Sequence, residues 1–170
     1  MVLAGSLVRL RRATRDDVAE LARIRATPEV YERWQGGDDL VASVEEDFDD
    51  PDLVGYVIEL DGRVVGWIQW EAEETPDYRH ASIDVYVDPA VHGRGVGTDA
   101  VRTLARHLLR DHGHHRITID PAADNAAAIR TYAKVGFRPV GIMRRYERGP
   151  DGTWHDGLLM DLLADELLEE

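Results

Sequence analysis

Three glycines, Gly93, Gly95 and Gly97, separate a strand-like segment from a helix-like segment. Glycine lets the backbone approach a ligand closely, and the first N–H groups of a helix have no partner within the helix. Because the helix dipole is positive at that end, such a turn is suited to binding phosphate. A tight turn without a ligand explains the same glycines, so both interpretations stay open on this stretch alone.

Two other nucleotide-binding patterns fit these glycines less well. The Gly-Lys-Ser/Thr sequence of a Walker A loop does not occur here. A dinucleotide-binding fold would start a series of parallel βαβ units at this point, and too little chain follows. The preceding chain also differs, because Asp61-Gly62 joins two strand-like runs as in an antiparallel hairpin.

The segments that must position the glycines have clear periodicities. Residues 81–87 alternate apolar and polar side chains, as in a strand with two different faces, and Pro89 ends the strand. From Val96 to Leu108 the apolar side chains follow helical spacing. The sequence therefore predicts a strand, a phosphate-binding turn and a helix in succession.

The whole chain predicts an α+β fold with a mixed, mostly antiparallel sheet flanked by helices. We expect this to be a single domain over residues 1–170, with residues 31–40 irregular or helical. The predicted helices span residues 18–25, 40–48, 96–108 and 126–135. The predicted strands span residues 7–12, 53–60, 63–70, 81–87, 116–120, 137–143 and 154–163.

The chain has 170 residues, a formal net charge of −13 and no cysteine. The acidic excess argues against nucleic acid and is compatible with a cationic substrate, although surplus carboxylates also serve solubility. Without cysteine, a thiol nucleophile is excluded. Neither a membrane-spanning run nor a signal peptide is present, so we expect a cytoplasmic protein without membrane contact. A monomer or a homodimer is expected.

Two motifs resemble those of the GNAT superfamily of acetyl-coenzyme A-dependent N-acetyltransferases. Residues 87–98, Val-Asp-Pro-Ala-Val-His-Gly-Arg-Gly-Val-Gly-Thr, look like its pyrophosphate loop, usually Gln/Arg-x-x-Gly-x-Gly/Ala. Residues 124–137 are similar to its Asn-x-x-Ala-x-x-x-Tyr-x-x-x-Gly-Phe segment. His92 departs from the usual Gln or Arg. The resemblance covers the chain from Val8 to Leu163 and implies a GNAT-like fold, acetyl-CoA as co-substrate and no metal.

Within the superfamily, the nearest pattern is that of the aminoglycoside 6′-N-acetyltransferases, which are linked to antibiotic resistance. Gly66-Trp-Ile-Gln-Trp70 resembles their Gly-Tyr-x-Gln strand, and Ser82-Ile-Asp84 resembles their Gly-Ile/Met-Asp. Ile119-Asp-Pro121 resembles the Asp-Pro before their second motif. Val85 departs from the Gln of that family.

This resemblance implies that Asp84 is the catalytic carboxylate and that Asp120 binds the substrate amine. An Asp in an otherwise apolar strand suits an ammonium, and a solvent-facing position is the alternative. Tyr132 is the second expected catalytic residue, because a phenol keeps its proton at neutral pH and can donate it to a thiolate; a core tyrosine is the alternative. The expected substrate-binding residues are Trp67, Gln69, Asp84 and Asp120.

Asn125 suits a helix cap and a cofactor contact equally well. The residues expected to contact acetyl-CoA are Val85, Tyr86, Val87, His92, Gly93, Arg94, Gly95, Val96, Gly97, Thr98, Asn125, Ala128 and Tyr132. Four histidines near the end of the glycine-loop helix lack carboxylates in a ligand pattern, so we expect a solvated basic helix end there and no metal site. They are His107, His112, His114 and His115.

Three functions agree with these features. The first is direct acetyl transfer from acetyl-CoA to a small polyamine, with the 6′-amine of an aminoglycoside preferred. The second is acetylation of a protein or peptide amine, as in the ribosomal N-terminal type. The third is a silent module that binds acyl-coenzyme A, which the presence of both Asp84 and Tyr132 disfavours.

Overall fold

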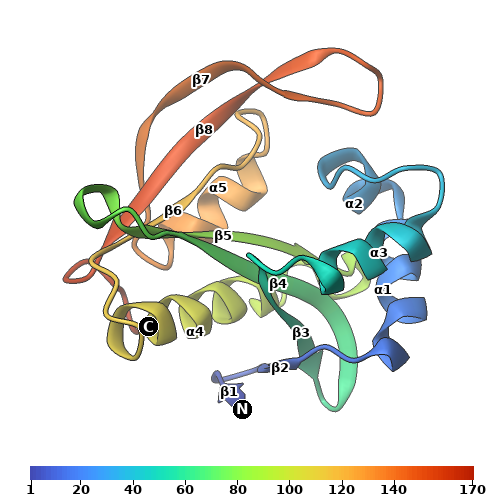
Figure 1. The fold of residues 1–170 in the computed structure, drawn as a ribbon, viewed down its shortest axis with the longest axis horizontal. Coiled ribbons are helices and arrows are strands. Elements are labelled where there is room, and N and C mark those ends of the chain that lie inside the picture. Colours follow the sequence, from blue (N-terminus) through green and yellow to red (C-terminus); the bar gives the residue numbers. More distant parts are fainter.

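The computed structural model describes residues 1–170 and contains one eight-stranded sheet with helices packed on it (Figure 1). The strand order is β1-β2-β3-β4-β5-β6-β8-β7, and only the β5–β6 pair is parallel. The strands are β1 (Val2–Ala4), β2 (Arg9–Arg12), β3 (Val54–Leu60), β4 (Arg63–Glu73), β5 (His80–Val87), β6 (Arg116–Ile119), β7 (Arg138–Arg148) and β8 (Trp154–Leu163). The helices are α1 (Val18–Arg25), α2 (Pro28–Arg33), α3 (Leu40–Asp49), α4 (Val96–Arg110) and α5 (Ala126–Ala133).

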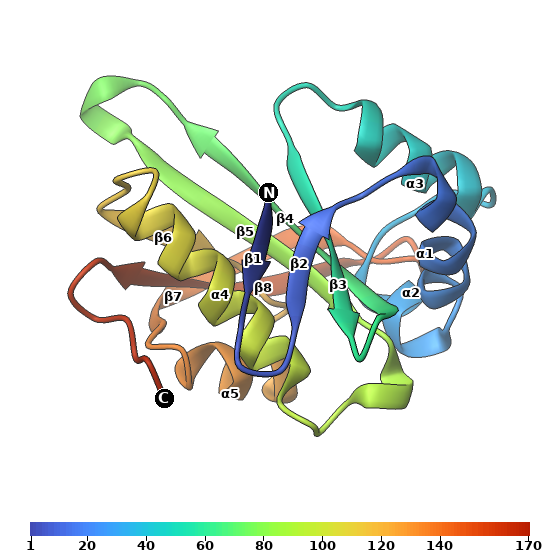
Figure 2. The same cartoon turned by 90° about the horizontal axis from the view of Figure 1, so that it is seen from below.

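Alternating side chains on the central strands build two separate cores. Ile83 on β5 belongs to the larger core, which α4 covers with Ala100, Val101 and Leu104. Tyr86 on the same strand belongs to the smaller core, which α1, α2 and α3 cover. Figure 2 shows these three helices gathered together at a distance from α4. The sheet is therefore buried on both faces around the point where β5 ends.

The antiparallel first half follows from local turn chemistry. Asp61 and Gly62 both have positive φ, 52° and 76°, which is the backbone conformation of a type I′ hairpin turn. Leu60 pairs with Arg63 directly across this turn, so the β3–β4 register is fixed as the sequence predicts. A capping interaction before α1 is also local, since the Thr14 N–H donates to Asp17 Oδ2 at 2.8 Å.

Strands β5 and β6 pair over two residues and then separate. The paired residues are Ala81 with Ile117 and Ser82 with Thr118, and the hydroxyls of Ser82 and Thr118 lie 3.1 Å apart on one face. Side chains repeat every two residues along a strand, so Asp84 and Asp120 lie one step further on that same face. The separation opens the sheet between these two carboxylates.

Several boundaries differ from the sequence prediction. Strand β1 was not expected, because three residues carry too short a pattern; it pairs with β2 from Val2 to Ala4. Thr27-Pro28 does end α1, but Pro28 also begins α2, where proline suits a first helical turn. On α3, Val44 is buried whereas Val41 is exposed.

The prediction of a solvated histidine cluster is wrong for two of its members. His107 and His114 are buried, with 6% and 2% of their surface exposed. Trp70 on β4 packs edge-on against His112 at 4.8 Å between ring centroids and covers the end of α4. No helix in the structure is long and apolar enough to cross a bilayer.

Candidate functional site

A cleft of about 1510 Å³ opens where β5 and β6 separate. Its walls come from α2, β5, the glycine loop, the end of β6, α5 and the hairpin of β7 and β8. Glycines of the loop and carboxylates of the strands both line this cleft, so it joins the two kinds of residue that the sequence singles out.

The glycine loop presents a row of free backbone donors. None of the N–H groups of residues 93–98 donates a hydrogen bond within the protein, and the first helical bond runs from the Asp99 N–H to the Gly95 carbonyl. Gly93 and Gly95 have φ values of 75° and 81°, which side-chain-bearing residues rarely adopt. Unpaired donors at the start of a 15-residue helix are suited to a pyrophosphate, so the loop fits coenzyme A.

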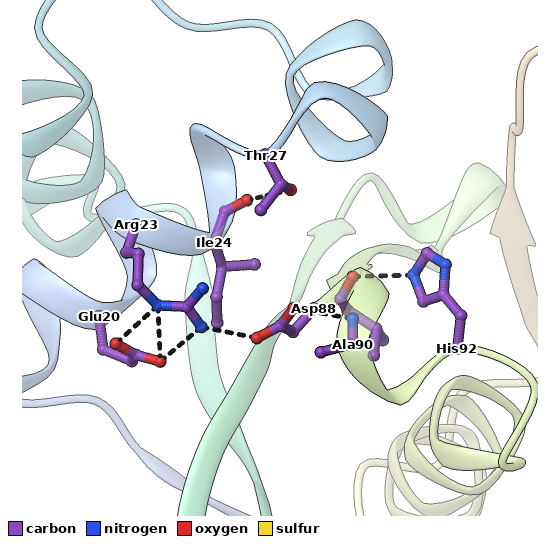
Figure 3. Close-up of polar contacts among 8 residues, drawn as sticks. Glu20, Arg23, Ile24, Thr27, Asp88, Ala90 and His92 are labelled. Atoms are coloured by element: carbon purple, nitrogen blue, oxygen red, sulfur yellow. Dashed lines mark hydrogen bonds and ion pairs between the residues drawn. The ribbon is translucent and has the colours of Figure 1, made fainter.

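Polar contacts hold the start of this loop in place (Figure 3). Asp88 accepts a hydrogen bond from the Ala90 N–H at 3.0 Å and an ion pair from Arg23 of α1 at 2.6 Å. Arg23 also pairs with Glu20. The His92 ring donates from Nε2 to the Val87 carbonyl at 2.9 Å, so this side chain supports the backbone of the loop.

Gly95→Val tests the loop directly. The positive φ at this position is strained for valine, and the rearranged backbone would lose its alignment with phosphate. We expect coenzyme A to bind at least tenfold more weakly, as measured by titration calorimetry. Gly113→Val is the matched control, because Gly113 has a φ of 68° at the far end of α4 with open space around it. Equal coenzyme A affinity in both folded variants would contradict the assignment.

Asp84 is a carboxylate with a strongly altered acidity. Burial, followed by the charges of Asp120 and Glu71, raises the pKa of Asp84 to about 7, while a hydrogen bond from Gln69 acts in the opposite direction. Gln69 lies opposite Asp84 on β4, and its Oε1 accepts from Trp67 Nε1 at 2.7 Å. Asp84 can therefore gain and lose a proton near neutral pH, as a general base must.

Asp120 lies across the opening from Asp84. Burial raises the pKa of the Asp120 carboxyl, and a hydrogen bond from Tyr146 partly opposes that rise. The Tyr146 hydroxyl donates to Asp120 Oδ2 at 2.8 Å. Two neighbouring carboxylates with raised pKa values form a site that a primary ammonium would neutralise.

Tyr132 of α5 lines the cleft with 8% of its surface exposed. Burial and the charges of Asp84 and Asp120 raise the pKa of its phenol, so it remains protonated. Its hydroxyl makes no hydrogen bond within the protein and is free to donate to a ligand. Asn125 caps α5, accepting from the Ala128 N–H at 3.2 Å, and it also lines the cleft.

Not every expected site residue reaches the cleft. Trp67 is buried in the smaller core, stacked on Phe48 at 5.3 Å, and its contribution is to orient Gln69. Arg94 is exposed and is not among the residues that line the cleft. The other expected residues, on β4, β5, the glycine loop, β6 and α5, are brought together.

Tyr146 is a site residue that the sequence did not indicate. The prediction ends β7 at Met143, whereas the strand continues to Arg148. The continuation carries an irregularity after Met143 that directs Tyr146 into the cleft. An irregular strand has no regular alternation of side chains, so no periodic signal pointed to this residue.

Comparison with known proteins shows the family. The Acetyltransferase (GNAT) family matches residues 18–137, and the chain belongs to that family. It is 31% identical over 165 residues to aminoglycoside N(6′)-acetyltransferase type 1 of Klebsiella pneumoniae, covering 85% of this chain and 79% of that protein. It is 35% identical over 136 residues to mycothiol acetyltransferase of Nocardia farcinica, covering 74% of this chain and 43% of that protein. The chain thus spans less than half of the mycothiol enzyme.

Solved structures agree with the fold. Mycobacterium smegmatis RimJ in complex with CoA-disulfide has a TM-score of 0.82 at 29% identity, covering 98% of this chain and 86% of that chain. AAC(6′)-Ib in complex with ribostamycin and coenzyme A has a TM-score of 0.77 at 27% identity, covering 95% of this chain and 96% of that chain. The predicted α+β, GNAT-like fold is confirmed, and relatives with different acceptors match comparably well.

Proposed function

We propose that this protein is an acetyltransferase that moves the acetyl group of acetyl-CoA to a primary amine of a small polycation, with the 6′-amine of an aminoglycoside preferred. The observation that carries the proposal is that Asp84 and Asp120, on one face of the opened sheet, line the same cleft as the glycine loop. Carboxylates there suit a cationic acceptor, and free backbone donors suit the diphosphate of coenzyme A.

Acetyl-CoA supplies a thioester carbonyl, at which a carbon–nitrogen bond forms while the carbon–sulfur bond breaks. Asp84 takes a proton from the ammonium, because its pKa of about 7 allows it to be ionised at neutral pH. Asp120 holds the same ammonium in place. The Tyr132 hydroxyl donates a hydrogen bond to the negative charge that develops on the leaving sulfur. With no cysteine in the chain, the acetyl group passes directly between the two substrates.

The surrounding charge favours a substrate with several amines. Glu71, Asp47 and Glu147 also line the cleft, so its field is acidic well beyond the two central carboxylates. The acidic segments at residues 38–52 and 71–77 contribute only Asp47 and Glu71 to the lining of the cleft. A polycation gains more from this field than a single ammonium does.

A salt series tests the acceptor class. Exposed charges are screened over about 10 Å at 0.1 M salt, so the attraction of a polycation falls steeply as salt rises. We expect the KM for kanamycin to climb severalfold between about 0.05 and 0.5 M salt, while a peptide with one amine shows little change. A peptide N-terminus or lysine acetylated with higher kcat/KM than any aminoglycoside would favour the protein-amine function instead.

A further inference from the structure

The hairpin of β7 and β8 carries an irregular segment beside the cleft. Met143 pairs with Gly157 and Glu147 pairs with His155, so residues 144–146 lie opposite Asp156 alone. Two residues are therefore extra on β7, which is the edge strand of the sheet. Bulges at sheet edges change the direction of a side chain. Figure 1 shows the hairpin arching away from the rest of the sheet.

The backbone of this bulge is held in a strained conformation. Arg145 has a φ of 49°, one of only two positive values at residues other than glycine, and the other belongs to the hairpin turn at Asp61. The Arg145 N–H donates to Asp156 Oδ1 at 2.8 Å, which fixes the strained residue against β8. Backbone strain of this kind persists where the surroundings enforce it, and it often accompanies a functional site.

The bulge places the Tyr146 ring against β8 and its hydroxyl on Asp120. A Cβ atom at Gly157 would lie 3.0 Å from Cδ1 of Tyr146, so the ring occupies the space that glycine leaves open. The Tyr146 hydroxyl then donates to Asp120 Oδ2 at 2.8 Å. Asp120 Oδ1 accepts no hydrogen bond from the protein. Tyr146 therefore fixes one oxygen of this carboxylate, and the other has no partner within the protein, on a residue that lines the cleft.

We propose that Tyr146 is a positioning residue for the acceptor amine, aimed by the bulge so that its hydroxyl orients Asp120 and leaves Oδ1 for the ammonium. This role rests on the proposed function, since it assumes that Asp120 receives the amine. Without the hydroxyl, the carboxylate would rotate and present its oxygens in several directions. The hydrogen bond also opposes the rise in the pKa of Asp120 that burial causes.

Tyr146→Phe removes only the hydroxyl. We expect its KM for kanamycin to rise about tenfold, in line with one charge-assisted hydrogen bond, while the KM for acetyl-CoA stays unchanged. Tyr78→Phe is the matched control, because Tyr78 is 74% exposed and lies outside the cleft. If Tyr146 acts through Asp120, the Tyr146→Phe change has no further effect on KM in an Asp120→Asn background. A full tenfold effect in that background would overturn the proposal, as would an unchanged KM in the single variant.

A second measurement does not depend on turnover. Carbon-13 titration of the Asp120 carboxyl should give a higher pKa in Tyr146→Phe than in the unchanged protein, since a donor to the charged form is lost. An identical titration in both would overturn the contact itself. If the titration shifts and the protein acetylates no polyamine, the contact stands and the proposed function fails, so the two failures are distinguishable.

Discussion

Replacing Asp84 by Asn lowers kcat/KM for a polyamine by about 100-fold or more, the range expected for loss of a general base. The amide keeps the size of the side chain and cannot take a proton from the ammonium. In the unchanged protein kcat/KM should rise with pH through about 7, where Asp84 loses its proton, and then level off. The variant should show no such rise. These pH profiles are measured by the release of free thiol.

The same substitution should stabilise the fold at alkaline pH. The pKa of Asp84 is about 7 in the folded protein, whereas an aspartate in an unfolded chain has a pKa of about 3.9, so the folded state binds the proton more tightly. The stability from this proton is complete below pH 4 and is lost as pH rises through 7. Asn carries no charge, so its advantage appears above pH 7 and is on the order of 2 kcal/mol.

Thermal unfolding of the two proteins at pH 5 and pH 8 checks this second effect. Asp161→Asn is a suitable control, because Asp161 lies on β8 outside the cleft and pairs with Arg116. Removing that partnered charge should not stabilise the protein at either pH.

The kinetic test has its own contrary outcome. If Asp84→Asn keeps a normal kcat/KM, Asp84 is not the general base.

Tyr132→Phe is expected to lower kcat by about 10- to 100-fold while the affinity for coenzyme A changes little. The substitution keeps the ring, which packs edge-on near Phe137 at 6.3 Å, and removes the hydroxyl that we propose as the donor to the leaving sulfur. An interaction made only in the transition state affects kcat more than ground-state binding. Steady-state kinetics together with calorimetry separate the two quantities.

Tyr56→Phe provides the comparison for this variant. Tyr56 is also buried, with 2% of its surface exposed, and it does not line the cleft. Its loss of a hydroxyl should leave kcat within about twofold. If Tyr132→Phe behaves like Tyr56→Phe, and a pre-steady-state burst shows that product release does not limit the rate, Tyr132 belongs to the core alone.

Regular patterns in the sequence predicted most of the fold. Strand β8 was predicted with its observed bounds, Trp154–Leu163, and the Asp61-Gly62 turn fixed the β3–β4 pairing. The spacing of apolar side chains and the residue types of a turn are local properties, so they can be recognised without the tertiary structure. The burial of His114 was missed because it involves Trp70, a residue distant in sequence. His107 packs edge-on against His112, which contacts the same tryptophan.

The sequence predicted those site residues that lie on regular strands and helices, where side-chain direction follows from position. Ser82 pairs with Thr118, and Asp84 and Asp120 each follow two residues later, so both carboxylates lie on the same face of the sheet. Trp67 was expected to contact substrate, but its strand position turns the ring into the smaller core. Tyr146 was missed because a bulge, and not the alternation of the strand, directs it. Side-chain direction at irregular backbone is not contained in a periodic pattern.

The most direct test of the central claim is a thiol-release assay with acetyl-CoA across a panel of amines, with mass spectrometry of the products. The panel includes kanamycin, a simple monoamine and short peptides with a free N-terminus or a lysine. The proposed function predicts one added acetyl group on kanamycin at a primary amine, the highest kcat/KM in the panel, and its near loss in Asp84→Asn. If folded protein that binds coenzyme A releases no thiol with any amine in the panel, this result would contradict the proposed function.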